Sequence, residues 1–544
     1  MSNPPLSFEK RTVLLIGITA LLKLLLCGLV ELNNDEVYYC TYAQHLQWNY
    51  FDHPPMVAVF IRIFTIGGLL NHELFIRLGS VLAAAVCTWI IFQIGKLLKD
   101  GYTGWLAACL FTASFYASVI AGMLILPDTP QLIFWLLSVY CILDIVKNKL
   151  HGRALNMRLL TTGFLIGLCM LSKVHGVFLW AGFGGYILFK ERRLLANPFL
   201  YISVLITAAM LIPSYLWTTH NQFSTVNYHS SRISFNKIQV DSFFRELFGS
   251  MLYNNPINVA LLISGCLYLR KKPGAFAGTG IAVLWWLGLP LIGTVIFLAV
   301  FNDTLPHWSG PAYTTLIPVT ALLMEGKSGI GSRQSSIGNR QSAINTLVRP
   351  VDIHDYRLPI AVKWALGLVG GILPIVITLI NFWPGSLGSD QMPAFGKGDV
   401  TLDMTGWRQF EHKFSNVYTK DKQQQLIDSS TCIFADYWFP AAHLWFYTGK
   451  PLQIPVMAVG SMGDIHHFAW LNQRVPPLRN NANAYYITVS NFYEPAPAEL
   501  TRYFESVSEP TLIPQERSGH VVRYFYIYRL MHYHGGLPRN GIIK

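Results

Sequence analysis

The sequence predicts a polytopic α-helical membrane protein that ends in a smaller α/β domain outside the membrane. Of its 544 residues, 52% are apolar and only 13% are charged, about half the charged share of an average soluble domain. Apolar stretches of membrane-spanning length recur throughout residues 1–383, whereas charged residues return and apolar runs shorten over residues 384–544. We therefore expect a transmembrane domain followed by a soluble domain.

A membrane-spanning helix needs about 20 apolar residues, and about eleven stretches of this chain approach that length. The fifth and sixth are short and nearly continuous, separated only by Ser172 and Lys173. Segment 56–70 is interrupted by Arg62 and a Gly-Gly pair, so we expect it to lie along the membrane interface. The expected spans are 12–30, 74–97, 104–122, 130–147, 158–171, 174–189, 199–217, 256–270, 279–301, 309–325 and 360–383.

The distribution of Lys and Arg predicts the orientation of these spans. Basic residues collect after every even-numbered span, for example Lys96 and Lys99 after the second. Because cytoplasmic loops are enriched in Lys and Arg, these loops and the N-terminus are expected in the cytoplasm. The same rule accounts for the net charge of +12 without a nucleic-acid-binding surface. The loop 326–359 is rich in Ser, Gly, Arg and Gln, which predicts a flexible cytoplasmic linker.

The loops after the odd-numbered spans carry acidic, histidine and aromatic residues instead. They are expected on the extracytoplasmic face, together with the C-terminal domain. Because they share one face, we expect them to contribute to one site. These segments are 31–73 (the first external loop, with Asp35 and Glu36), 127–130, 173–175, 217–220 and 303–308.

The C-terminal domain shows the patterns of a small α/β fold. A buried strand is expected at 431–435, a helix through 441–447, and further strands at 485–489 and 520–528. The eight cysteines include no CxxC pair, so neither a zinc site nor a redox motif is indicated.

The first external loop holds the acidic residues with the strongest case for catalysis. A carboxylate such as Asp35 can accept the proton of an attacking hydroxyl, and its neighbour Glu36 can help to raise its pKa toward that task. Asp35 is equally suited to cap the helix that starts near Glu36. Asp52 and His53 add a carboxylate and an imidazole, and a metal ion would use these two if the loop bound one.

Charged residues in the later external segments suit a phosphate-containing substrate. Asp128 starts the fourth span between two prolines, a position that also favours helix capping. Lys173, His307 and Arg232 can neutralise a lipid phosphate, although a lysine at an interface often only extends its ammonium to water. The loops contain no GxGxxG, P-loop or HExxH pattern, so soluble nucleotide chemistry is not indicated.

Five short motifs occur in a fixed order: DEVYY at 35–39, FDHPP at 51–55, PDTP at 127–130, LSK at 171–173, and LPHW followed by PAY at 305–313. Together, these motifs resemble the membrane glycosyltransferases of family 39. This family includes bacterial relatives of protein O-mannosyltransferases and of the lipid A aminoarabinose transferase. The resemblance covers about residues 10–383, and the stretch from Gly406 to Pro451 is similar to the external domain of the bacterial branch.

The resemblance implies a GT-C fold and transfer of a hexosyl or pentosyl group from a polyprenyl-phosphate donor at the outer face of the bacterial inner membrane. Asp35 matches the family's essential first-loop aspartate and would act as base. Asp128 matches its second acid, with Glu36 beside the base. Asp52 and His53 match a glutamate and a lysine of the aminoarabinose branch. The donor phosphate is assigned to His53, Lys173, His307 and Arg232, and other substrate contacts to Asp52, Tyr38, His175, Trp308 and Tyr313.

The expected reaction needs no organic cofactor, because the lipid phosphate is already an activated leaving group. Attack in line with that group would invert the anomeric centre. The sugar, the glycolipid or protein acceptor, and any need for a divalent cation stay open. A lipid-linked sugar flippase is one alternative, although polar residues at one face and the absence of an internal repeat of the spans disfavour it. A surface-polysaccharide ligase is another.

Overall fold

The computed structural model describes residues 6–221, 227–228, 230, 233–271, 280–328 and 358–543. The chain divides into two compact units, which we call the helical unit and the sheet unit. The sheet unit also takes in two segments of the first external loop, which the sequence boundaries group with the membrane domain. The helical unit comprises Met1–Leu25, His53–Phe60 and Phe75–Ile372, and the sheet unit comprises Leu26–Asp52, Ile61–Leu74 and Leu373–Lys544.

Within the described residues, six helices are long and apolar enough to cross a membrane. They are α4 (Glu73–Leu98), α6 (Asp128–Lys147), α7 (Gly152–Ser172), α9 (Pro198–His220), α13 (Ile281–Ala299) and α16 (Ile360–Phe382). Each lies where a span is predicted. Shorter or less apolar helices occupy the remaining predicted spans, so the total of eleven stays a prediction.

The other helices of this part of the chain are α1 (Phe8–Cys27), α3 (Met56–Phe64), α5 (Gly101–Thr112), α8 (Val177–Lys190), α11 (Val240–Tyr253), α12 (Pro256–Lys271) and α14 (Gly310–Ser328). The third predicted span is broken, because α5 ends at Thr112 and a separate π-helical turn covers Tyr116–Ile120. Helix α11 lies between the predicted spans 199–217 and 256–270, in a segment predicted to be external, where no helix is predicted. The predicted cytoplasmic linker falls almost entirely outside the described residues.

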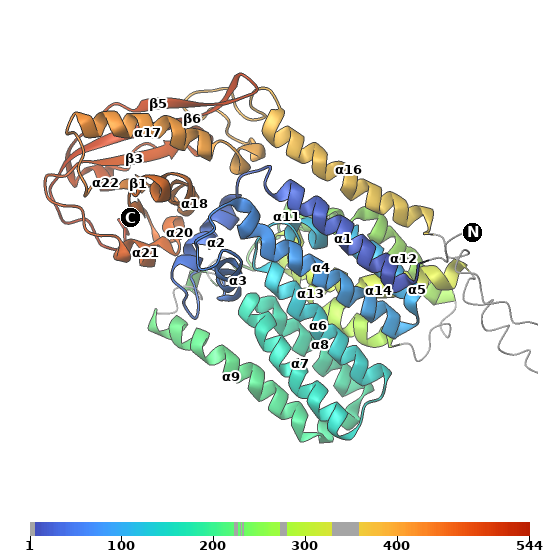
Figure 1. Ribbon diagram of the computed structural model, residues 1–544. Coiled ribbons are helices and arrows are strands. Elements are labelled where there is room, and N and C mark those ends of the chain that lie inside the picture. The colour runs from blue at the N-terminus through green and yellow to red at the C-terminus, as the bar shows by residue number, and fades with distance from the viewer. Residues whose placement is uncertain are drawn as a thin grey trace, which may run out of the picture. The chain divides into compact units, whose positions relative to one another are not determined.

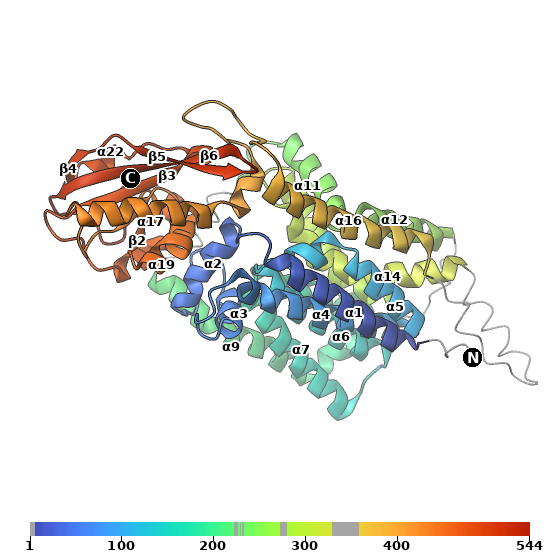
Figure 2. The ribbon, with the colours of Figure 1, turned by 45° about the horizontal axis from the view of Figure 1, so that its top comes forward.

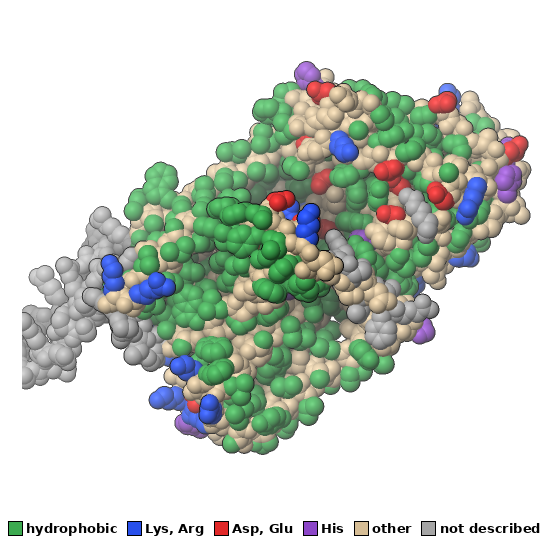
Figure 3. Space-filling model, turned by 180° about the vertical axis from the view of Figure 1, so that it is seen from behind, with side chains coloured by type: hydrophobic (Ala, Val, Ile, Leu, Met, Phe, Trp, Pro, Cys, Tyr) green, Lys and Arg blue, Asp and Glu red, His purple; other side chains and the backbone are tan. Residues whose placement is uncertain are grey.

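Glycines allow the helix backbones of the helical unit to approach closely. A Cβ atom at Gly163 of α7 would lie 2.2 Å from the carbonyl oxygen of Ser203 in α9, and one at Gly182 of α8 would lie 2.3 Å from that of Trp286 in α13. Figures 1 and 2 show α7 running beside α6 in this bundle. In Figure 3 hydrophobic side chains cover most of the helical unit's visible face, as expected of a surface in contact with lipid.

Two short 3₁₀ turns place polar residues at the ends of these helices. Helix α7 stops at Ser172 because Lys173 adopts an extended conformation, with φ −158° and ψ 136°. The turn Val174–Gly176 follows before α8 begins. A second turn, Pro306–Ser309, precedes α14 and starts with proline, whose fixed φ suits a first helical position.

The sheet unit is built on a mixed six-stranded sheet with the order β2-β1-β3-β6-β4. The sixth strand, β5, pairs with residues 520–527 of β6, whereas β4 pairs with residues 530–533. Strands β2, β1 and β3 are parallel, whereas β6 is antiparallel to β3, β4 and β5. The structure confirms strands at the three predicted places and adds three more. The strands are β1 (Ile433–Ala435), β2 (Val456–Ala458), β3 (Ala484–Val489), β4 (Phe504–Val507), β5 (Thr511–Arg517) and β6 (His520–Tyr533).

Helix α17 (Trp407–Gln423) packs on the sheet, as Figures 1 and 2 show, and its aromatic stripe forms part of the core. Phe410 stacks on Phe525 of β6 at a ring-centroid distance of 4.0 Å. Helix α2 (Asn34–Gln44) packs against α18 (Trp438–His443), so the first loop and the C-terminal segment share one core. The remaining helices are α19 (Lys450–Leu452), α20 (Met462–Ile465), α21 (Phe468–Leu471) and α22 (Ala498–Thr501).

Candidate functional site

A buried ion pair between Asp128 and Lys173 forms the centre of the helical unit's polar site. Asp128 begins α6 and Lys173 follows the end of α7, and the lysine Nζ lies 2.8 Å from Oδ2 of the aspartate. Their side chains are 2% and 6% exposed. The Tyr116 hydroxyl donates to the other carboxylate oxygen at 3.1 Å. The pair therefore holds one cation in a dry position, with ammonium hydrogens left for a substrate oxygen.

Two histidines from the 3₁₀ turns lie around this pair. His175 contacts Trp308 with the ring centroids 5.8 Å apart, and its Nδ1 is buried without a hydrogen-bond partner in the described part of the chain. His53 is close enough to His175 for their charges to interact. Burial and the charge of Lys173 lower the pKa of His307 to about 4. His307 is thus neutral near pH 7 and can donate a hydrogen bond to phosphate, but it does not bring the positive charge that the sequence predicts.

Helix α11 covers the turn that holds His307, a feature that the sequence analysis missed. The ring of Tyr253 lies 6.1 Å from that of His307, and Pro306 fills the space that a Cβ at Gly249 would need. On the same helix, Glu246 is 1% exposed and interacts electrostatically with Tyr313. In the sequence, only one feature indicated this arrangement: the acid Glu246 within an amphipathic stretch of a segment predicted to be external.

In the sheet unit, Asp52 is held by three side chains. The hydroxyls of Tyr38 and Tyr42 donate to its Oδ2 at 2.6 and 3.0 Å, and Nδ1 of His466 lies 3.4 Å from its Oδ1. Tyr38 is 2% exposed, and its hydroxyl also accepts the backbone N–H of His467. In this structure the Tyr38 hydroxyl positions Asp52, and its substrate contact stays a prediction. Sequence reasoning missed His466 and His467, since they are distant in the chain.

The acidic pair Asp35–Glu36 lies in the first turn of α2. The capping residue is Asn33, not Asp35, because its side chain accepts the N–H of Glu36 at 2.9 Å. Glu36 is fully buried and its Oε2 accepts the N–H of Asn33 at 3.1 Å, which completes a capping box. Asp35 is exposed. Of the two acids, Asp35 is thus the one accessible to a substrate.

The structure adds little for the remaining predicted residues. Trp308 and Tyr313 are partly buried in the helical unit, and Arg232 lies outside the described residues. Across the described ranges, no three His, Cys, Asp or Glu side chains are grouped as metal ligands. Asp52 and His53 are thus not part of such a group in the portion of the chain that the structure describes.

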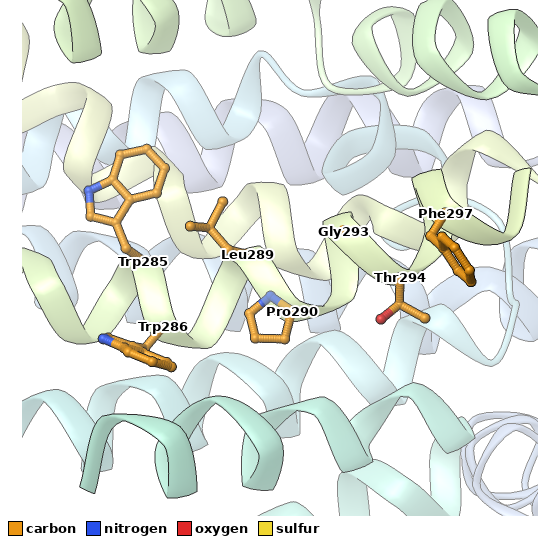
Figure 4. A pocket seen from close by; sticks show the side chains of 7 residues that line it. All are labelled: Trp285, Trp286, Leu289, Pro290, Gly293, Thr294 and Phe297. Atoms are coloured by element: carbon orange, nitrogen blue, oxygen red, sulfur yellow. The ribbon is translucent and has the colours of Figure 1, made fainter. Parts of the chain in front are cut away.

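A groove of about 500 Å³ runs along α13, and its lining is almost entirely apolar. Figure 4 shows that its labelled side chains all come from this one helix, from Trp285 to Phe297. It contains no titratable side chain, so sugar or phosphate chemistry does not belong there. The groove suits hydrocarbon, and the polar site described above suits the reacting groups.

Comparisons with known proteins identify the family and the fold that this chain resembles. Residues 52–217 match the family model described as dolichyl-phosphate-mannose-protein mannosyltransferase. The lipid A galacturonosyltransferase RgtD of Rhizobium johnstonii is 23% identical over 304 residues, a match that spans 54% of this chain and only 62% of that protein.

Two crystal structures of ArnT from Cupriavidus metallidurans are similar over 95% of this chain. The apo structure matches with a TM-score of 0.59 and 13% identity over 98% of that chain. The structure bound to undecaprenyl phosphate matches with a TM-score of 0.56 and 14% identity over 97% of that chain. The protein is thus an integral membrane protein with the GT-C fold, and its resemblance to the glycosyltransferases of family 39 is confirmed.

Proposed function

We propose that this protein is a membrane glycosyltransferase that moves a sugar from a polyprenyl-phosphate donor to a glycolipid of the bacterial envelope. The observation that carries the proposal is the buried pair of Asp128 and Lys173, with the neutral imidazole of His307 nearby. An ammonium held in a dry site stabilises charge on a departing phosphate far better than one in water. The undecaprenyl phosphate bound in one ArnT structure and the lipid A in the name of the similar galacturonosyltransferase support this class of donor and acceptor.

The proposed step is a single displacement at the anomeric carbon. An acceptor hydroxyl or phosphate oxygen attacks that carbon, and the bond to the lipid phosphate breaks. Asp35 takes the proton of an attacking hydroxyl, and Lys173 stabilises the polyprenyl phosphate that leaves. Attack from the side opposite the leaving group inverts the anomeric configuration, so a product with retained configuration would contradict this step.

The reaction is expected on the extracytoplasmic face of the inner membrane, where the polar segments and the C-terminal domain are predicted to lie. A lipid A-like acceptor is favoured over a protein by the name of the similar galacturonosyltransferase. The step needs no redox or organic cofactor. Turnover measured with and without a chelator decides whether a divalent cation assists it.

The first experiment compares purified wild-type protein with Asp35→Asn. Each is incubated with a panel of undecaprenyl-phosphate sugars and extracted envelope lipids or proteins, and the release of undecaprenyl phosphate is measured. Glu505→Gln, which changes an exposed acid of the sheet unit, is the matched control. We expect turnover in the wild type and the control, and its loss in Asp35→Asn with an unchanged melting temperature.

Two results would redirect the proposal. If Asp35→Asn is still active, the protein is a glycosyltransferase but its base is another acid. Asp128 would be tested next. The second result is that neither the wild type nor its variants release lipid phosphate from any donor, while liposomes that contain the wild type move a lipid-linked sugar across the bilayer. In that case the protein is better described as a flippase.

A further inference from the structure

One carboxylate of the helical unit has an oxygen that the fold does not satisfy. Glu246 lies on α11 and is 1% exposed. Its Oε2 accepts a hydrogen bond from the hydroxyl of Thr304 at 2.8 Å, whereas Oε1 is buried without a partner in the described part of the chain. A buried acceptor without a partner destabilises the fold, and a charged one does so more strongly, so a bound hydrogen-bond donor is expected at this oxygen.

The neighbouring polar groups are already engaged elsewhere. Arg245, the next residue on α11, forms an ion pair with exposed Asp303. The hydroxyl of Ser242 donates to the carbonyl of Asn302 at 2.6 Å. Tyr313 forms a hydrogen bond with Ser250, one turn along the helix from Glu246. None of these contacts supplies a hydrogen to Oε1.

A chain of packing contacts connects the helix of Glu246 with the buried ion pair. Its helix packs on the turn that holds His307, with Pro306 against Gly249. The same turn leads into α14, where Gly310 leaves room for the ring of Tyr116. Tyr116 in turn donates to Asp128. The helix that carries the unsatisfied oxygen is thus linked, through this turn and Tyr116, to the pair at which the phosphate of the donor is proposed to bind.

We propose that Oε1 of Glu246 binds the donor sugar by accepting a hydrogen bond from one of its hydroxyl or ammonium groups. This inference rests on the proposed function. A lipid phosphodiester brings no hydrogen for a carboxylate, and the attacking hydroxyl is assigned to Asp35, which leaves the transferred sugar as the partner. A charge-assisted hydrogen bond is stronger than a neutral one and depends on geometry, so Glu246 is a specificity-determining residue of the donor site.

The test uses the full-length protein with Glu246→Gln and Glu246→Ala, and Asp241→Asn as the control on the same helix, where the acid is exposed. The donor is the undecaprenyl-phosphate sugar that the wild type uses best. KM is measured for donor and acceptor, and undecaprenyl phosphate without a sugar is tested as an inhibitor. We expect the donor KM to rise about tenfold or more in both variants, as loss of one charged hydrogen bond predicts. Acceptor KM and inhibition by the sugar-free lipid should stay unchanged.

Three outcomes would overturn the inference. An unchanged donor KM means that Glu246 does not contact the sugar. A changed acceptor KM with an unchanged donor KM assigns it to the acceptor. Equal weakening of donor and sugar-free lipid means that the substitution disturbs the phosphate site or the fold. Failure of the proposed function is distinct, because the wild type itself would then show no turnover.

Discussion

Replacing Lys173 by methionine tests whether the buried ion pair serves catalysis as well as stability. Methionine keeps the length and the apolar stem of the side chain but removes the charge. With 2.8 Å between the charged atoms and an effective dielectric constant of about 20, the pair attraction is about 6 kcal/mol before desolvation is counted. Because Asp128 would be left buried and unpaired, we expect a net loss of about 3–5 kcal/mol.

The melting temperature in detergent measures this loss. A shift of about 2 °C per kcal/mol is the lower end of the range for domains of 150–250 residues, so we expect a decrease of roughly 6–10 °C. In the double variant Asp128→Asn with Lys173→Met, no charge remains to be paired. The double variant should therefore recover most of the decrease in melting temperature seen in Lys173→Met.

Turnover separates the two roles. Both Lys173→Met and the double variant should lack transferase activity, since neither offers a cation to the departing phosphate. Recovered activity in the double variant would refute this reasoning, because the pair would then matter only for folding. An unchanged melting temperature in the single variant would show that the two charges are not buried together.

Three further predictions concern packing, capping and pH. Gly182→Ala should lower the melting temperature because its Cβ would meet the α13 backbone, whereas Gly184→Ala, with no atom within 4 Å, should not. Glu31→Ala should destabilise the sheet unit by about 1–2 kcal/mol in thermal melts and speed its proteolysis, because Glu31 accepts two N–H groups at the start of α17. Burial lowers the pKa of His467 to about 3, so the unfolded chain takes up its proton first as the pH falls below about 6.5. Stability should therefore drop between pH 7 and pH 5, and His467→Phe should reduce that drop by up to about 2 kcal/mol in melts recorded at the two pH values.

Apolar run length made the helices of the helical unit predictable. In a membrane, a long apolar run that ends at a charged residue or a proline has few alternatives to a helix. The predicted break at Ser172 and Lys173 is where helix α7 ends. The sequence predicted one shared face of the membrane for Lys173 and Asp128, but their direct ion pair became visible only in the structure. Helix α11 was missed because its amphipathic 14 residues do not form an apolar run of spanning length.

The partners of Asp52 could not be predicted for a different reason. Tyr38 and Tyr42 lie nearby in the chain, at helical spacing, but His466 comes from the far end of the sequence. Sequence periodicity describes local structure only, so it cannot predict a contact between residues this far apart in the chain. The same applies to Glu31, whose only sequence-level signal is an acidic side chain in a polar loop, although it caps a helix that starts at Trp407.

These long-range contacts explain why the C-terminal segment matters for the proposed base. Asp35 lies on a short helix, which would be marginal on its own. In the sheet unit, Asn34 contacts His443 at 3.0 Å, and the N–H of Leu32 donates to the Tyr447 hydroxyl at 2.8 Å. Tyr447 also donates to Glu73, which pairs with Arg408. The start of helix α2 and the later residue Glu73 are thus held by the C-terminal segment. The orientation of Asp35 depends on that segment, which is a positioning element for the carboxylate even if it never contacts a substrate.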